Sequence, residues 1–119
     1  MESQQTAKYS TMQEIVTGYI DLICTANPVF ATYIGRHDLD HTLGYQSLDA
    51  FESTIEATKK LESELEATVP ADQAEGIDKD LVLGQMRWLS IHHELVATHR
   101  TNPSYYTELG LEGLFLQII

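Results

Sequence analysis

The chain has 119 residues, enough for one domain with one hydrophobic core, and 43% of them are hydrophobic, which excludes a disordered protein. With 18 acidic and 7 basic residues the net charge is −11, so we expect neither nucleic acid nor an anionic membrane surface as a partner. No apolar run approaches the ~18 residues of a membrane-spanning helix. The one cysteine, Cys24, excludes an internal disulfide and is expected to be buried. The opening residues lack a secretory signal, so a cytoplasmic location is expected.

Local signals predict two helices at the start of the chain. Thr11 and Glu14 have the spacing of a capping box, and apolar residues then recur at every third or fourth position. This pattern predicts a helix over residues 11–25. Asn27 is a good N-cap and Pro28 suits the first turn of a helix, so a second, short helix is expected to follow directly.

Gly35 is expected to end the short helix, and residues 36–46 are expected to connect it to the next one. Ser47 is the predicted N-cap of a helix over residues 47–68. The predicted buried face of that helix consists of Leu48, Phe51, Ile55, Leu61 and Leu65.

A long helix is predicted from Asp72 to about His99. Its expected core-facing residues form a wide apolar stripe of Ile77, Leu81, Trp88 and Leu95. Gly84 interrupts this helix at a cost of ~1 kcal/mol relative to alanine, which we attribute to the close approach of a neighbouring helix. Asn102 and Pro103 then predict the start of a last helix.

No strand pattern competes with these helices, so the predicted fold class is all-α. We expect an antiparallel helical hairpin or bundle of about four helices. Residues 1–10 are expected to form a flexible tail, and residues 11–119 a single helical segment.

The last eleven residues are crowded with large apolar side chains and lack the polar signals that usually close a helix. We expect Leu111, Leu114 and Ile118 to pack inward on the long helix. Phe115 and Ile119 would then point elsewhere. The chain is therefore expected to be an incomplete part of a larger helical protein, with these five residues forming an interface to a missing C-terminal part or to a second copy.

The stretch HDLDH, residues 37–41, places two histidines and two aspartates within five residues. A metal site is one interpretation, because imidazole and carboxylate groups are metal ligands. A polar connection in which these side chains satisfy backbone groups and each other is a second, and the flanking glycines favour it. In a third, His37 and Asp40, together with Tyr105, line a cleft that other parts of a protein complete. We expect no metal ligand here.

The stretch HHELVATH, residues 92–99, begins as a zinc-peptidase helix does, but the second histidine of that motif would fall at Ala97. On an unbroken helix His99 lies off the face of His93. His92 and His99 would share a face but stand two turns apart, too far to hold one ion well. We therefore expect no catalytic residue and no cofactor in this chain.

Much of the chain resembles the N-terminal segment of the bacterial and archaeal family called domain of unknown function 885. The resemblance lies in the segments NPVFATYIGRHDLDHTLGYQSLDAFE, IDKDLVLGQMRWLSIHHEL and RTNPSYYTELGLEGLF. The positions that carry the resemblance are Ala31, Thr32, Gly35, His37, Asp40, Ile77, Asp78, Asp80, Leu81, Asn102, Pro103 and Tyr105. The resemblance implies a longer helical protein similar to zinc-dependent peptidases of the gluzincin kind. The family's presumed His-Glu-x-x-Pro-Gly-His-like metal motif lies far downstream of this segment, and this chain contains nothing of that form.

The expected function is therefore that of a non-catalytic N-terminal helical segment of a metallopeptidase-like protein, with zinc only in a full-length parent. The alternative is a small helical protein-interaction module that uses its apolar C-terminal face.

Overall fold

The computed structural model describes residues 11–44 and 46–118, and every regular element in them is helical, which confirms the all-α class. The long helices are α1 (Met12–Ala26), α3 (Leu48–Glu66), α4 (Gln73–Ile91) and α6 (Ser104–Ile118). The short elements are α2 (Pro28–Tyr33), the π-helical turn η1 (His92–Val96) and α5 (Thr98–Thr101). None of the described helices combines the length and apolarity needed to cross a membrane.

The helix starts that the sequence predicts are confirmed by their capping hydrogen bonds. The Thr11 hydroxyl accepts from the Glu14 N–H at 3.2 Å, and the Glu14 carboxylate accepts from the Thr11 N–H at 3.1 Å. The Asn27 side chain accepts from the Phe30 N–H at 3.1 Å, and the Ser47 hydroxyl caps α3 in the same way at 3.2 Å. Each cap satisfies an N–H group that the first turn of a helix leaves without an intrahelical partner.

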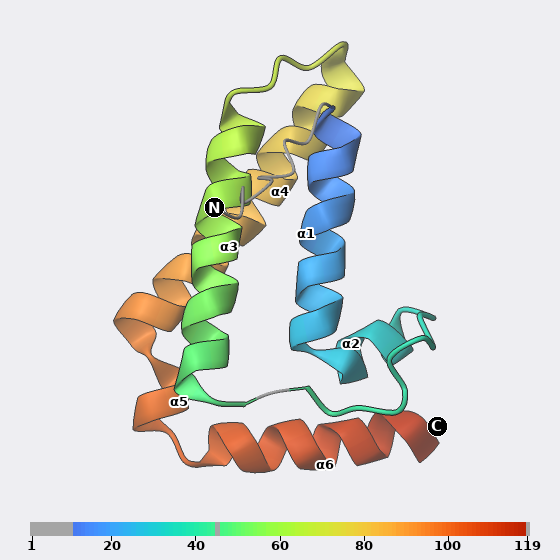
Figure 1. The fold of residues 1–119 in the computed structure, drawn as a ribbon, viewed down its shortest axis with the longest axis vertical. Helices are drawn as coiled ribbons and strands as arrows, with labels where there is room; N and C mark the ends of the chain where they lie inside the picture. Colours follow the sequence, from blue (N-terminus) through green and yellow to red (C-terminus); the bar gives the residue numbers. More distant parts are fainter. Residues whose placement is uncertain (1–10, 45, 119) are drawn as a thin grey trace, which may run out of the picture.

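Three long helices pack side by side, and the last one crosses their ends. Figure 1 shows α1 antiparallel to α3 and α3 antiparallel to α4, with α4 behind the other two in this view. The α6 helix runs crosswise beneath the ends of α1 and α3, where it contacts α2 and α5. The main core lies at the end of the three-helix layer away from α6.

This core holds side chains from α1, α3 and α4. Its buried members are Ile15, Leu61, Leu65, Leu83 and Met86. Cys24 is buried as a free thiol, as predicted. The predicted face of α3 is confirmed at Ile55, Leu61 and Leu65, but the prediction for Leu48 is wrong, because that side chain at the first turn is 47% exposed.

The prediction of a buried stripe on α4 is wrong, because Ile77, Leu81 and Trp88 are each more than half exposed, as is Leu95 in η1. The residues that α4 buries are Leu83, Met86 and Ser90. At about 100° per residue, this buried face lies roughly opposite the exposed apolar stripe. Only one side of α4 meets α3 and α1, so the second apolar side stays uncovered.

Gly84 lies in the middle of the exposed stripe of α4. A Cβ atom placed there would meet no described atom within 4 Å, so close approach of a helix of this chain does not explain the glycine. That prediction is wrong for contacts within the described chain.

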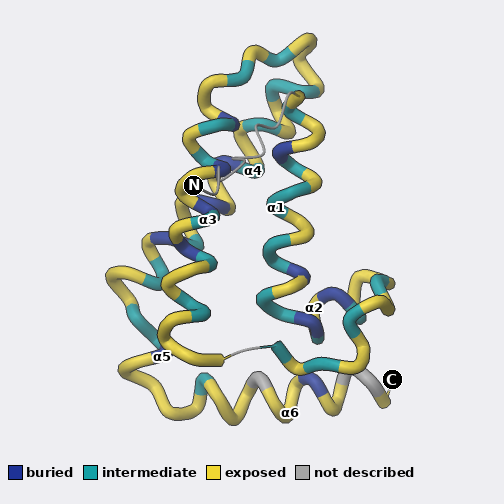
Figure 2. Tube along the Cα trace, viewed as in Figure 1, coloured by how far each residue is buried: buried dark blue, intermediate teal, exposed yellow. Residues whose placement is uncertain are grey.

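The inward packing predicted for Leu111, Leu114 and Ile118 of α6 is also wrong, because each is more than half exposed. Phe115, predicted to point elsewhere, is more than half exposed as well. α6 packs on α2 through the side that carries Gly113. A Cβ atom added at Gly113 would lie only 3.1 Å from a methyl carbon of Val29. Figure 2 shows the mostly exposed surface of α6. Ile119, the fifth predicted interface residue, lies outside the described residues.

Candidate functional site

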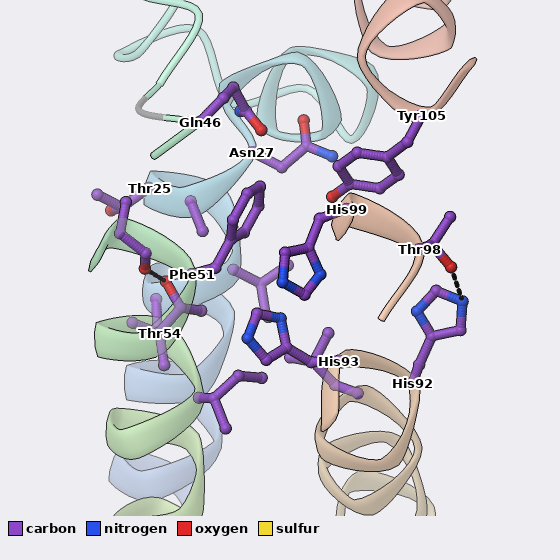
Figure 3. Close-up of a pocket in the computed structure, with 16 residues that line it drawn as sticks. Thr25, Asn27, Gln46, Phe51, Thr54, His92, His93, Thr98, His99 and Tyr105 are labelled. Carbon is purple, nitrogen blue, oxygen red and sulfur yellow. Dashed lines mark hydrogen bonds between the residues drawn. The ribbon is translucent and has the colours of Figure 1, made fainter. Parts of the chain in front are cut away.

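A cavity of about 330 Å³ lies between α1, α3 and the segment that follows α4, and we call it the histidine pocket (Figure 3). The C-terminal end of α1, the N-terminal half of α3, η1, α5 and the first turn of α6 surround it. Its lining consists of Leu22, Ile23, Thr25, Ala26, Asn27, Gln46, Ala50, Phe51, Thr54, Ile55, Leu89, His92, His93, Thr98, His99 and Tyr105. Half of these residues are aliphatic, Phe or Tyr, and the other half are Thr, Asn, Gln or His, so the lining combines apolar surface with hydrogen-bonding groups, as small-molecule sites do.

A break in the backbone after α4 brings two histidines together in this pocket. The predicted helix to His99 ends at Ile91 and continues as the wider π-helical turn η1. Ala97 then adopts the left-handed conformation (φ 49°, ψ 44°), and its N–H donates to the His92 carbonyl at 2.9 Å. The short helix α5 restarts in a new direction from Ala97, so residues after it no longer follow the face pattern of α4.

His93 and His99 consequently stack face to face, with ring centroids 4.3 Å apart and an angle of 5° between the ring planes. The prediction that they lie on different faces is wrong, because it assumed an unbroken helix. His92 makes other contacts. Its ring stacks on that of Trp88, with the centroids 4.8 Å apart, and its Nε2 lies 3.3 Å from the Thr98 hydroxyl oxygen (Figure 3). His92 and His99 both line the pocket, each stacked on a different ring.

Phe51 of α3 joins the histidine pair to the start of α6. Its ring centroid lies 5.0 Å from that of His99, 5.8 Å from that of His93 and 6.0 Å from that of Tyr105. These are ordinary separations for interacting rings. Phe51 and three rings from residues 93–105 thus form one cluster of rings in the lining of the pocket.

The surroundings of His93 and His99 favour the uncharged form of both imidazoles. Burial lowers the pKa of both His93 and His99 below the ordinary value, and the nearby Arg100 guanidinium lowers both further. A neutral imidazole presents one hydrogen-bond donor and one acceptor. Among the described residues, neither imidazole has a hydrogen-bond partner for its ring nitrogens. The pair can therefore hydrogen-bond an uncharged molecule.

We expect the free energy of unfolding to fall as the pH drops from about 7.5 to about 5.5. A histidine whose pKa is lowered by folding binds more protons in the unfolded chain, so its stabilising contribution is complete above its unfolded value of about 6.5 and is lost below it. Asp38 and Asp40, with pKa values lowered from 3.8, stay ionised across this range. Urea denaturation at both pH values measures the effect, which the His99→Phe variant should reduce; an unchanged pH dependence in that variant would contradict this account.

The HDLDH stretch lies apart from the pocket, in the exposed connection between α2 and α3. His37 Nδ1 is 2.9 Å from an Asp40 carboxylate oxygen, and the Thr32 hydroxyl donates to the other oxygen at 2.5 Å. The Thr32 hydrogen bond is the main reason that the pKa of Asp40 is lowered. Arg36 pairs with Asp38 at 3.2 Å, which lowers the pKa of that carboxyl. These contacts are those of a polar connection.

Of the three residues predicted to line a cleft, the structure places Tyr105 in the histidine pocket, whereas His37 and Asp40 are not part of its lining. Within residues 11–44 and 46–118, no group of three or more His, Cys, Asp or Glu side chains could hold a metal ion. Comparisons of this chain with protein-family models, with curated proteins and with solved structures gave no match.

Proposed function

We propose that this chain is a non-catalytic helical segment that packs against further helices of a metallopeptidase-like protein, as its resemblance to the domain of unknown function 885 implies. The observation that supports the proposal is that α4 and α6 each carry an apolar face opposite the face that packs within the chain. A helix that is apolar on opposite sides is typical of a position between two neighbours.

On α4 the uncovered face comprises Ile77, Leu81 and Trp88, each more than half exposed, with Gly84 among them. These positions fall within about 60° of arc around the helix. Because the space above Gly84 is open, a helix from outside the described chain could approach the backbone closely there. The cost of glycine in a helix is then offset by a contact that the larger protein supplies.

On α6 the uncovered face comprises Leu111, Leu114, Phe115 and Ile118, all more than half exposed. These positions lie on the side roughly opposite Gly113, which packs on α2. Each such side chain stabilises a fold by ~1.5–3 kcal/mol when it is moved from water into a core. An exposed apolar face of this kind is typical of a surface that contacts another part of a protein.

The same faces suit the alternative function, a small protein-interaction module that binds a separate partner through α6. The reading frame that follows this sequence distinguishes the two. A continuation that encodes a His-Glu zinc motif supports the packing segment, and a clean intergenic gap supports the module.

The test is the association state of the isolated chain, in which a second copy takes the place of the missing helices. Sedimentation velocity at tens of micromolar should detect dimers or larger assemblies, and Phe115→Glu or Trp88→Glu should weaken association by roughly tenfold or more, since each introduces a charge into an apolar contact. Val69→Glu is the matched control, because Val69 is exposed in the connection between α3 and α4, away from both faces.

Two outcomes would contradict the proposal. A monomer at tens of micromolar, unaffected by either substitution, would mean that neither face needs a partner. Zinc-dependent peptide hydrolysis by the isolated chain that a His93→Ala substitution abolishes would exclude a non-catalytic segment.

A further inference from the structure

We propose that the histidine pocket binds a small, uncharged, flat aromatic molecule of about two fused rings, which stacks beside Phe51 and hydrogen-bonds to His99. This ligand site is independent of the packing function proposed above. It rests on the size of the cavity, its ring-lined wall, a buried histidine without a partner and the pairing of the surrounding charges.

The size of the cavity sets the size of the ligand. The pocket measures about 330 Å³, at the lower end of the range of small-molecule sites, ~300–1,000 Å³. An apolar cavity of about 150 Å³ holds one benzene molecule. The histidine pocket therefore has room for a bicyclic molecule but not for a nucleotide or an extended peptide.

The wall favours a flat aromatic ligand over a saturated one. Phe51, Tyr105 and the stacked pair of His93 and His99 place ring faces and edges along one side of the cavity. Aromatic molecules gain from offset-stacked or edge-to-face contact with such rings beyond the area they bury. Aliphatic side chains such as Leu22 and Ile55 complete the lining.

His99 provides the group that fixes the orientation of the ligand. It is only 8% exposed, it lines the pocket, and its ring nitrogens have no hydrogen-bond partner among the described residues. The His99 nitrogens are not sealed inside the protein, so they are available to hydrogen-bond a molecule that enters the cavity. A hydroxyl or a ring N–H on the ligand can supply that hydrogen bond.

The charges around the pocket indicate an uncharged ligand. Arg100 forms an ion pair with Glu52 at 3.5 Å, and Lys59 forms one with Glu94. Each charged side chain named here therefore already has a partner of opposite charge within the chain. Burial keeps His93 and His99 neutral by lowering their pKa values. A charged ligand would therefore lose its hydration without gaining an opposite charge.

Equilibrium dialysis of the intact chain against 2-naphthol at about pH 7.5 tests the proposal. With about eleven non-hydrogen atoms, 2-naphthol should bind one per chain with a Kd on the order of 0.1 mM. Three analogues of the same framework should each bind at least fivefold more weakly: 2-naphthoate, which is anionic, 2-naphthylmethylamine, which is cationic, and decahydro-2-naphthol, which is saturated. An analogue that binds as well as 2-naphthol would overturn the chemical class.

Variants locate the site. His99→Phe keeps the ring but removes its nitrogens and should weaken 2-naphthol binding about five- to tenfold, whereas His41→Phe in the exposed connection should not change it. Ala50→Leu fills the cavity from α3 with a good helix former and should weaken binding at least tenfold even if His99→Phe fails to fold. Phe115→Glu should leave binding unchanged. Binding that survives Ala50→Leu, or that Phe115→Glu abolishes, would assign the molecule to an exposed apolar face and overturn the proposal, as would no binding at millimolar 2-naphthol.

Discussion

Replacement of Leu65 by alanine is expected to lower the free energy of unfolding by about 3–4 kcal/mol, the middle of the range for large-to-small substitutions in a core. Leu65 is fully buried at the centre of the cluster that joins α1, α3 and α4. The helices around it cannot collapse into the space without losing their other contacts, so a cavity remains. Urea denaturation followed by circular dichroism, at a concentration where the monomer dominates, measures the change.

Leu81→Ala is the matched control, since it makes the same substitution on the exposed face of α4. Its expected effect is within about 0.5 kcal/mol, because alanine is at least as good a helix former and little apolar surface is uncovered. A loss at Leu81 equal to that at Leu65 would mean that the stripe of α4 is covered within the monomer, contrary to the structure.

The local part of the fold could be predicted because its signals lie within a few residues. The capping box of Thr11 and Glu14 and the Asn27 cap act through hydrogen bonds between neighbours in the sequence. Helix periodicity then identified Ile55, Leu61 and other buried residues of α3, where only one side of the helix is apolar.

The buried side of α4 could not be predicted, because this helix is apolar on two opposite sides. Leu83 and Met86 face the core, whereas Ile77 and Leu81 face outward, and periodicity alone does not choose between them. The choice depends on where the second and third helices meet, which is long-range information. The same holds for α6. Its packed side carries Gly113, and the pattern of apolar side chains gives no sign that a glycine is the contact.

The histidine pocket was missed because its formation depends on Ala97. Alanine is the strongest helix former, so nothing in the sequence indicates that Ala97 adopts a left-handed conformation and ends the regular helix. The histidines themselves were a visible signal, but their spacing was interpreted on an unbroken helix. The ring wall also needs Phe51 and Tyr105, which come from segments far apart in the sequence.

Replacement of Gly44 by alanine is expected to lower the free energy of unfolding by about 2–4 kcal/mol, the sum of a backbone and a packing cost. Gly44 has a positive φ of 77°, a conformation that residues with a side chain rarely adopt. A Cβ atom there would lie 2.9 Å from the Pro28 Cδ and 3.1 Å from the Ala26 carbonyl oxygen. Neither atom is at the end of a flexible side chain, so the connection must move away from the junction of α1 and α2.

Gly35→Ala separates the two costs. Gly35 has a similar φ of 88°, but a Cβ atom there would meet no described atom within 4 Å. This variant should therefore lose only the backbone contribution, about 1–2 kcal/mol. Urea denaturation of both variants beside the unchanged chain gives the comparison. Equal losses at the two glycines would show that the contacts at Gly44 cost nothing, and that the connection is not held against the junction of α1 and α2. A larger loss at Gly44 would mean that the close contact with Pro28 and the Ala26 carbonyl holds the connection against the junction of α1 and α2.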